Sequence, residues 1–464
     1  MAINGPQHMS SMAKEQVVAP LSTGLCVGYG LGSLGTGLYG TVPGLLLLYF
    51  MTQVLGIEAG LAGTAIFLPK VWDVIIDPFM GMATDRTRSR WGRRRPWLLA
   101  GALLLPLSFW AMFTVPALDS STQRGLYVSA LYVLAALGFT FFQIPYIAMP
   151  AELSPDPHER TRIVSYRMAF MTAGILAGGA LAPMLVKWGG GGEPGYRLMG
   201  LVLAAVLLAS MLGSFWMTAK APLKELAHHE LLPGLRESLS GLKSRAFLCL
   251  AGGSALVFCG VSVVLAAVPF YTRYILGRGE ETVTLLFVCL VLPAMLTMPL
   301  WVKLARRIGK RLTYILSVSL FALGTLIFLV GASVPIWVLY VVTAGMGVAY
   351  AGSQLLPFSM LTDVIQYEGQ RSGLRQEGVF TGLWTATEGI GMAGGALVAG
   401  AILQVMGFQE ASGGVEVAQT PQALQGVVWV MSLIPSALCL LGLPLLSRYE
   451  IQEAHLLNGP GRSD

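Results

Sequence analysis

Three charged side chains stand inside one apolar stretch of the sequence, namely Lys70, Asp73 and Asp77. In a helix, their spacing of three and four residues places all three side chains on one face. A charge at the centre of a membrane helix costs roughly 2.5–3.5 kcal/mol, so two carboxylates there need a counter-ion, water or a bound cation. The pattern therefore predicts a cation site, for sodium or for a proton. The alternative is a structural ion pair in which Lys70 neutralises one aspartate.

A second charged cluster begins where this stretch ends, with Asp85 and Arg86 ahead of the arginine run Arg88–Arg95. Gly81 lies four residues before Asp85 and would let two helices approach closely. We expect Asp85 to pair with arginines across the seam between two halves of the molecule, as a lock on one conformation. The residues assigned to this gating role are Asp85, Arg86, Arg93, Arg94, Glu152, Asp363, Arg371 and Arg375.

The elements that position these residues follow from composition. The chain has 464 residues, of which 55% are hydrophobic and only 12% charged, and its mean hydropathy is +0.67. Soluble domains carry roughly 25% charged residues. Apolar stretches of about 20 residues, long enough to cross a membrane, recur along the whole chain. Since the alternating pattern of barrel strands does not occur, the predicted fold class is an all-α integral membrane protein.

Hydropathy predicts twelve spans in two bundles of six, separated by a polar linker. The spans lie near residues 21–51, 60–83, 96–115, 126–150, 164–187, 198–218, 246–272, 282–303, 312–331, 335–360, 378–407 and 423–447. The predicted organisation is a tail at 1–20, an N-terminal bundle at 21–218, a linker at 219–245, a C-terminal bundle at 246–450 and a tail at 451–464. Lysine and arginine concentrate in loops after even-numbered spans, which places these loops and both termini in the cytoplasm.

Two sequence echoes indicate that the second bundle repeats the first. The basic loop after the second span returns after the eighth span as Lys303–Arg311. Likewise, the stretch Gln143–Arg162 is matched by Gln354–Arg375, with a glutamine, a proline, an acid and arginines in the same order. Parallel halves with a solute site at their interface are typical of secondary transporters.

Several classes of function are excluded by the same residues. The net charge of +6 does not indicate nucleic-acid binding, because the basic residues lie in short loops between spans. The five cysteines lie in apolar segments and lack zinc-ligand spacing. No phosphate loop or catalytic triad can be assembled, so we expect neither an enzyme nor a cofactor. The expected partners are a small-molecule solute and membrane lipid, and the expected state is a monomer.

Four motifs together resemble the glycoside–pentoside–hexuronide:cation symporters of the major facilitator superfamily, which include melibiose permease. They are the W-D-x-x-x-D-P-x-x-G block of Trp72–Gly81, the R-S-R-W-G-x-x-x-P-W run of Arg88–Trp97, the I-P-Y turn of Ile144–Tyr146 and the stretch from Asp363 to the R-x-E-G of Arg375–Gly378. The resemblance covers almost the whole chain. It implies two pseudo-symmetric six-helix bundles and symport by alternating access in a bacterial inner membrane.

The resemblance also implies roles for single residues. Asp73 and Asp77 match the family's cation-site carboxylates, and Thr140 matches a hydroxyl that helps to ligate sodium. Lys70 matches a basic residue beside them, and Arg167 falls where the family places an arginine that contacts solute. With other polar or aromatic residues at membrane depth, the candidate solute-contacting residues are Lys70, Gln143, Tyr146, Arg167, Gln354, Trp384 and Glu388.

Three departures from the family's pattern change the expectation. Ile76 stands where many members carry asparagine, so the site lacks one oxygen ligand. This favours a proton as the coupling ion, and sodium stays the alternative. Gly37 and Gln143 stand where melibiose permease has acids that hold galactoside hydroxyls, so a galactoside is not expected. Glu388 lacks the lysine that often follows it. It is either a second titrating group or a glutamate hydrogen-bonded to nearby threonines.

The sequence thus predicts a cation-coupled symporter of a small organic solute, glycoside-like or sugar-acid-like. A lysophospholipid-like or other amphipathic solute is the alternative within this class, because the sugar-holding acids are missing. A receptor or channel that does not transport solute against a gradient is the alternative of another class.

Overall fold

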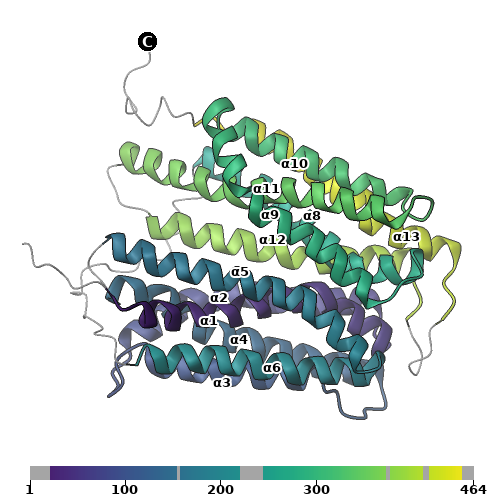
Figure 1. Cartoon of the computed structure of the whole chain (residues 1–464), viewed down its shortest axis with the longest axis horizontal. Helices are drawn as coiled ribbons and strands as arrows, with labels where there is room; N and C mark the ends of the chain where they lie inside the picture. The colour runs from purple at the N-terminus through teal and green to yellow at the C-terminus, as the bar shows by residue number, and fades with distance from the viewer. Residues whose placement is uncertain (1–20, 154–156, 220–243, 373–376, 411–416, 452–464) are drawn as a thin grey trace, which may run out of the picture.

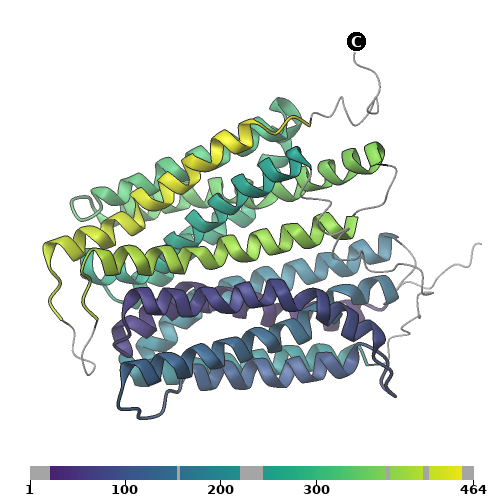
Figure 2. The same cartoon turned by 180° about the vertical axis from the view of Figure 1, so that it is seen from behind.

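The computed structural model describes residues 21–153, 157–219, 244–372, 377–410 and 417–451, and within these ranges it is helical with no strand. Figures 1 and 2 show long helices that run side by side along one axis. Ten of the described helical segments are long and apolar enough to cross a membrane. Helices α1 and α2 match the first two predicted spans. The predicted all-α membrane fold is confirmed, while the linker and the two tails lie largely outside the described residues.

The first half of the chain builds one group of helices. Its members are α1 (Thr23–Val42) with the π-helical turns η1 (Pro43–Leu47) and η2 (Phe50–Val54), α2 (Ala59–Arg86), α3 (Arg95–Met112), α4 (Ser121–Leu153), α5 (Pro157–Trp188) and α6 (Gly192–Met217). Helix α1 packs against α5 and α6, α3 packs against α4 and α6, and α2 packs against α4. These helices, coloured purple to blue, form the lower part of Figure 1.

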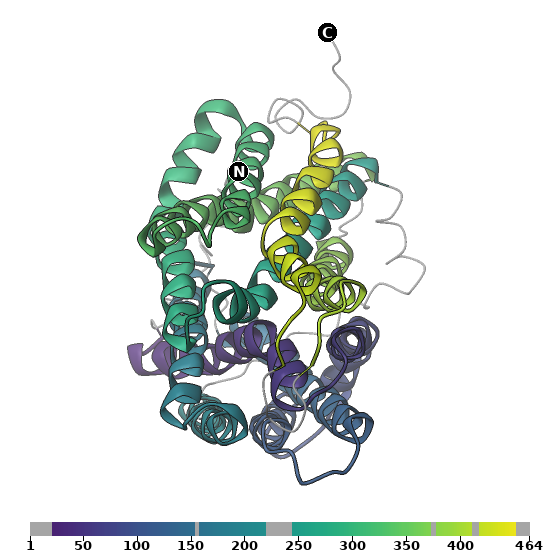
Figure 3. The ribbon, with the colours of Figure 1, turned by 90° about the vertical axis from the view of Figure 1, so that its right-hand side faces the viewer.

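The second half forms a matching group. Its members are α8 (Arg245–Phe270) with η4 (Tyr271–Ile275), α9 (Glu280–Ile308), α10 (Lys310–Leu326) with η5 (Ile327–Leu329), α11 (Ile336–Ser372), α12 (Glu377–Val405), α13 (Pro421–Met431) and α14 (Leu433–Ser447). Helix α8 packs against α12 and α14, α9 packs against α11, and α10 packs against α11 and α14. Seen along the helices, the two groups stand one above the other (Figure 3).

The two halves meet along a small set of elements. Helix α2 packs against α12, α5 packs against α9, and η1 packs against α8. Loop 87–94 and residues 21 and 451 lie at one end of the molecule, which we call the basic end. The opposite end is called the far end. In Figure 1 the basic end is on the left. Since α2 carries the charged residues of interest, the acids lie on a helix that also forms the seam.

Local sequence signals explain where several helices begin and end. Ser22, Ser244 and Thr420 are N-caps, and each accepts a hydrogen bond from the backbone N–H three residues later. Gly309 has a φ of 84°, which glycine adopts without strain, and it separates α9 from α10. These signals hold the loops short, so that consecutive helices lie side by side.

Some helix boundaries differ from the predicted spans. Helix α5 begins at Pro157 rather than near 164, and α11 continues to Ser372 rather than ending near 360. Both extensions are polar turns beyond the apolar stretch, since helical hydrogen bonding does not require apolar side chains. The first predicted span, near 21–51, contains Pro43. Pro43 lacks a backbone N–H, and the helix continues past it as π-helical turns.

Candidate functional site

An ion pair on α2 joins two of the three charged residues singled out by the sequence. Lys70 Nζ lies 3.0 Å from Asp73 Oδ2, and the two side chains are 27% and 12% exposed. The same ammonium lies 5.6 Å from the centre of the Phe139 ring on α4, within cation–π range. Lys70 is therefore held from two helices, by a carboxylate and by an aromatic face.

The third residue, Asp77, is bound by a different partner. The Thr140 hydroxyl on α4 donates a hydrogen bond of 3.0 Å to Asp77 Oδ1. One helical turn separates Asp77 from Asp73, so the two carboxylates are neighbours on one face of α2. The structure thus brings Lys70, Asp73, Asp77 and Thr140 together where the sequence predicted a cation site. Their role in binding a cation stays a prediction.

Two buried tyrosines lie near the Lys70–Asp73 pair. Tyr39 on α1 and Tyr132 on α4 are buried, and both lie within electrostatic range of Asp73. Among the described residues, the Tyr39 hydroxyl and Asp73 Oδ1 are buried without a hydrogen-bond partner. A buried polar atom left unpaired costs about 1–3 kcal/mol, so both atoms would gain from pairing with a bound ligand, ion or water.

Arg167, Gln143 and Tyr146 lie together in the N-terminal half. The Arg167 guanidinium is 6.0 Å from the Tyr146 ring, and no ion pair satisfies it among the described residues. The Arg167 Nε and Gln143 Oε1 atoms are buried and have no hydrogen-bond partner in the part of the chain that the structure describes. Tyr146 is itself packed between helices, because its ring stacks on Tyr29 at 4.4 Å and its hydroxyl bonds to Ser33 at 2.9 Å. Its contact with solute stays a prediction.

The candidates of the C-terminal half lie on α11 and α12. Gln354 donates a hydrogen bond of 2.5 Å to the Tyr350 hydroxyl, and Glu388 is within electrostatic range of that same tyrosine. Trp384 is 1% exposed, contacts Phe358 edge-on, and has a buried indole N–H without a partner in the described chain. Glu388 has no hydrogen bond or ion pair with any described residue. The neighbouring position is open, because a Cβ added at Gly389 would meet no atom within 4 Å. The alternative that threonines bind Glu388 is not what the structure shows, because their hydroxyls donate to α12 carbonyls.

The residues assigned to the gate are only partly described. The side chains of Asp85 and Glu152, and all of Arg375, lie outside the described part of the structure. Arg86 and Arg371 are exposed, Arg93 is partly buried and Arg94 is buried. Asp363 accepts bonds of 2.7 Å at both oxygens from Lys310, which belongs to the same half. The predicted pairing of Asp85 across the seam stays a prediction.

Polar contacts at the far end join the halves, and the sequence reasoning missed them. The Tyr274 hydroxyl donates to Gln53, Gln404 donates to Glu58, and Lys187 pairs with Glu281. Backbone groups take part as well, since Ala59 N–H donates to Glu410 at 3.2 Å and Thr284 donates to the Ala180 carbonyl at 3.1 Å. A signal was available, because polar residues flank the spans at this end. Which of these residues pair could not be predicted from the sequence, since each pair joins distant parts of the chain.

Glycines make the seam between α2 and α12 tight at the far end. A Cβ at Gly400 would lie 2.3 Å from the Ala59 carbonyl oxygen and 3.3 Å from Gly63 Cα. Toward the basic end of α12 the packing is open, since a Cβ at Gly382 or Gly389 would meet nothing within 4 Å. The two halves are therefore in close contact at the far end.

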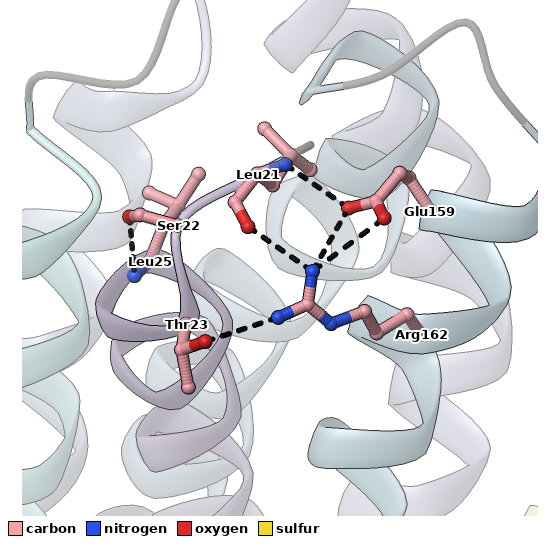
Figure 4. A network of polar contacts seen from close by, with 6 residues as sticks. All are labelled: Leu21, Ser22, Thr23, Leu25, Glu159 and Arg162. Carbon is pink, nitrogen blue, oxygen red and sulfur yellow. Dashed lines mark hydrogen bonds and ion pairs between the residues drawn. The ribbon is translucent and has the colours of Figure 1, made fainter. Parts of the chain in front are cut away.

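The start of α1 is held to α5 at the basic end (Figure 4). Glu159 accepts a hydrogen bond of 3.1 Å from Leu21 N–H, and Arg162 donates to the Leu21 carbonyl at 3.1 Å. Arg162 also donates to the Thr23 hydroxyl at 3.1 Å and pairs with Glu159 at 3.4 Å. These bonds fix the entry of the chain into the first helix.

Comparison with known proteins adds to this geometry. The model of the family described as MFS/sugar transport protein matches residues 28–453. A putative glycoside/cation symporter of Escherichia coli (strain K12) is 28% identical, over 93% of this chain and 92% of its own length. The glucuronide carrier protein homolog of the same organism is 26% identical, over 93% of each chain. A solved nucleoside transporter has the same fold, with a TM-score of 0.66 at 13% identity over 91% of this chain and 98% of its own.

Proposed function

The chain belongs to the MFS/sugar transport family, and from that premise we propose that it is a cation-coupled symporter of a small organic solute. The observation that carries the proposal is Asp77, a membrane-embedded carboxylate bound by the Thr140 hydroxyl beside the Lys70–Asp73 pair. Residues of this kind inside a membrane mark ion pathways. The coupling cation is a proton or sodium.

The position of Asp77 offers a route from cation binding to movement of the halves. Helix α2 carries Asp77 nine residues before its end at Arg86 and packs against α12 through Gly63 near its far end. A cation bound at Asp77 changes the charge on a helix of the seam. Coupling requires only that cation and solute each favour the doubly occupied carrier. In such a cycle the far end is closed in one state, as described above, and open in the other.

The solute is proposed to be glycoside-like or sugar-acid-like and to bind between the halves. Support comes from relatives named for glycosides and glucuronides, and from buried polar groups in both halves that have no partner among the described residues. Arg167 would bind a carboxylate or hydroxyl of the solute from the N-terminal half. Gln143, Gln354, Trp384 and Glu388 would supply hydrogen bonds and an aromatic face.

The protein is a multi-pass membrane protein. We propose that it lies in a bacterial inner membrane with its basic end in the cytoplasm, because arginine and lysine concentrate there. A monomer is sufficient for the proposed cycle, since both halves belong to one chain.

Transport into proteoliposomes tests the proposal. A panel of glycosides, uronates and lysophospholipids would be offered under a proton gradient and, separately, under a sodium gradient. We expect accumulation of a glycoside or uronate, and we expect Asp77→Asn to reduce it to the level of protein-free vesicles. Asparagine keeps the size of the side chain and an oxygen for Thr140, so folding should persist.

Asp119→Asn is the matched control, because Asp119 is an exposed acid in the loop between α3 and α4. It should leave accumulation unchanged. Undiminished uptake by Asp77→Asn would remove the proposed coupling role. Accumulation of lysophospholipids alone would favour the amphipathic solute, and wild-type protein that accumulates no solute under either gradient would favour a receptor or channel.

A further inference from the structure

One face of helix α2 carries large apolar side chains that are exposed. They are Leu61, Leu68, Trp72 and Phe79, each between 45% and 58% exposed. At about 3.6 residues per turn, these positions fall within roughly 40° around the helix, and Lys70, Asp73 and Asp77 fall on the other side. The acid side contacts α4. The apolar face is therefore directed out of the N-terminal bundle, where a membrane helix meets lipid.

Arg86, the last residue of α2, continues this lipid-facing stripe. It follows Phe79 by seven residues, which is nearly two full turns, and it is exposed. A long arginine side chain at the end of a membrane helix reaches the level of the lipid headgroups. No described residue forms an ion pair or a side-chain hydrogen bond with Arg86. Its guanidinium is thus available to an anion at that level.

The turn after α2 presents further basic and aromatic side chains. Arg88, Arg90 and Trp91 are exposed, and the Arg90 guanidinium lies 5.3 Å from the centre of the Trp91 ring. Ser89 fixes the turn, because its hydroxyl accepts the Trp91 backbone N–H at 3.1 Å and donates to the Gly92 carbonyl at 2.9 Å. Tryptophan is enriched at the interface between lipid and water. The turn therefore places positive charge and an indole ring side by side.

The rest of the arginine run is directed into the protein. Arg94 is buried, and Arg95 donates a hydrogen bond of 2.7 Å to the carbonyl of Thr218, the C-cap of α6. The Trp97 indole N–H donates to the Thr87 hydroxyl at 2.8 Å. These contacts hold the loop to the bundle. The exposed set is called here the arginine–tryptophan cluster, and it consists of Arg86, Arg88, Arg90 and Trp91.

We propose that the arginine–tryptophan cluster is a binding site for the headgroup of an anionic phospholipid. The guanidinium groups bind the phosphate, for which the planar fork of arginine is well suited. The acyl chains lie along the apolar stripe of α2, which leads directly to Arg86. Membrane surfaces that contain anionic lipid attract basic segments beside membrane helices. A ligand with a phosphate and apolar chains matches both parts of this surface, whereas a dissolved anion matches only one.

Purified protein in detergent tests this inference without any solute or ion gradient. The midpoint of thermal unfolding would be measured in micelles that contain phosphatidylglycerol or, at equal mole fraction, phosphatidylcholine. A ligand that binds only the folded protein raises this midpoint. We expect phosphatidylglycerol to raise the wild-type midpoint by several degrees more than phosphatidylcholine does. The double variant Arg86→Gln/Arg90→Gln should lose more than half of this difference.

Arg306→Gln/Arg307→Gln is the matched control. It removes the same charge from the corresponding loop of the C-terminal half, where both arginines are exposed and the stretch 303–311 contains no tryptophan. It should keep the difference between the two lipids. If the first double variant does not fold, Trp91→Leu replaces it, because this change keeps every charge and removes the indole. Trp91→Leu should lose about half of the difference.

Four outcomes overturn the inference. The first is a wild type that responds equally to the two lipids. The second is an equal loss in both double variants, which would show a general attraction to surface charge. The third is an equal shift by sodium phosphate, measured against sodium chloride of the same ionic strength, which would show a site for a dissolved anion. The fourth is a Trp91→Leu protein that keeps the full difference. Failure of transport for every solute would reject the proposed function and leave these measurements unaffected.

Discussion

At the residue scale, the charged groups inside the membrane divide into paired and unpaired ones. Lys70 and Asp73 form an ion pair, whereas Arg167 and Glu388 have no ion-pair partner among the described residues. Arg167 lies ten residues after the start of α5 at Pro157, and Glu388 lies eleven residues after the start of α12 at Glu377. At a rise of about 1.5 Å per residue, both lie roughly 15 Å from the basic end, in opposite halves. The unpaired groups are therefore those available to a solute or a proton.

Glu388→Gln is expected to flatten the pH dependence of transport. Glutamine imitates the protonated acid, so the variant should keep its rate as pH rises where the wild type loses it. The charged or titratable group facing Glu388 in the described chain is Tyr350. The measurement is solute uptake over a series from about pH 4 to pH 9, which begins near the ordinary pKa of a glutamic acid, about 4.3. Glu193→Gln is the control, because Glu193 lies at the start of α6 with a side chain that is 45% exposed. An unchanged profile for Glu388→Gln would mean that this glutamate is structural.

At the element scale, α2 and α12 form the tightest part of the seam, because glycines let their backbones touch. A side chain at Gly400 would collide with backbone atoms of α2, and backbone cannot move aside as a flexible side chain can. Closure of the far end therefore depends on the absence of a side chain at this position. The opposite stretch of α12, around Gly382, carries no such constraint.

Gly400→Leu should hold the far end open. The reporter is Thr284→Cys, placed where α9 touches α5, in a chain whose five native cysteines are replaced. We expect a membrane-impermeant maleimide to label this cysteine several times faster in Gly400→Leu, and uptake to fall strongly. Gly382→Leu makes the same change in open space on the same helix. Equal labelling rates in the two glycine variants would show that the α2–α12 contact does not control the far end.

The sequence was most informative where one element holds all the residues concerned. Lys70, Asp73 and Asp77 share α2, so helical periodicity alone predicted that they lie together. Thr140 lies on α4 and was placed beside Asp77 by family resemblance, since no spacing rule connects two helices. The far-end pairs, such as Glu58 with Gln404, could not be predicted from the sequence for the same reason. The Lys70 contact with Phe139 also depends on how α2 and α4 pack.

At the scale of the whole molecule, the halves are two bundles that meet along a seam, and polar pairs join them across its far end. Such an arrangement can rock, because each bundle has its own packed interior. The bundles meet mainly where α2 packs against α12, α5 against α9 and η1 against α8. The exposed Lys187–Glu281 and Gln404–Glu58 pairs at the far end are worth little individually, about 0–1 kcal/mol each. They can therefore break and reform during a transport cycle.

A cross-link over the far end should stop this motion. Tyr274 of η4 and Gln53 of η2 are in hydrogen-bond contact across the seam. With cysteine at both positions in a cysteine-free chain, a short bismaleimide should abolish uptake, while each single-cysteine variant treated in the same way should keep it. Full uptake by the cross-linked protein would show that the far end need not open.

The anchoring of α1 to α5 has a consequence for how the family's sequences vary. Glu159 accepts a hydrogen bond from the Leu21 backbone N–H, and Arg162 donates one to the Leu21 carbonyl. Neither bond involves the Leu21 side chain. Any residue except proline can supply both groups. Across related proteins we therefore expect position 21 to vary in side-chain identity but to exclude proline, and we expect the acid and the arginine that bind it to change only as a pair.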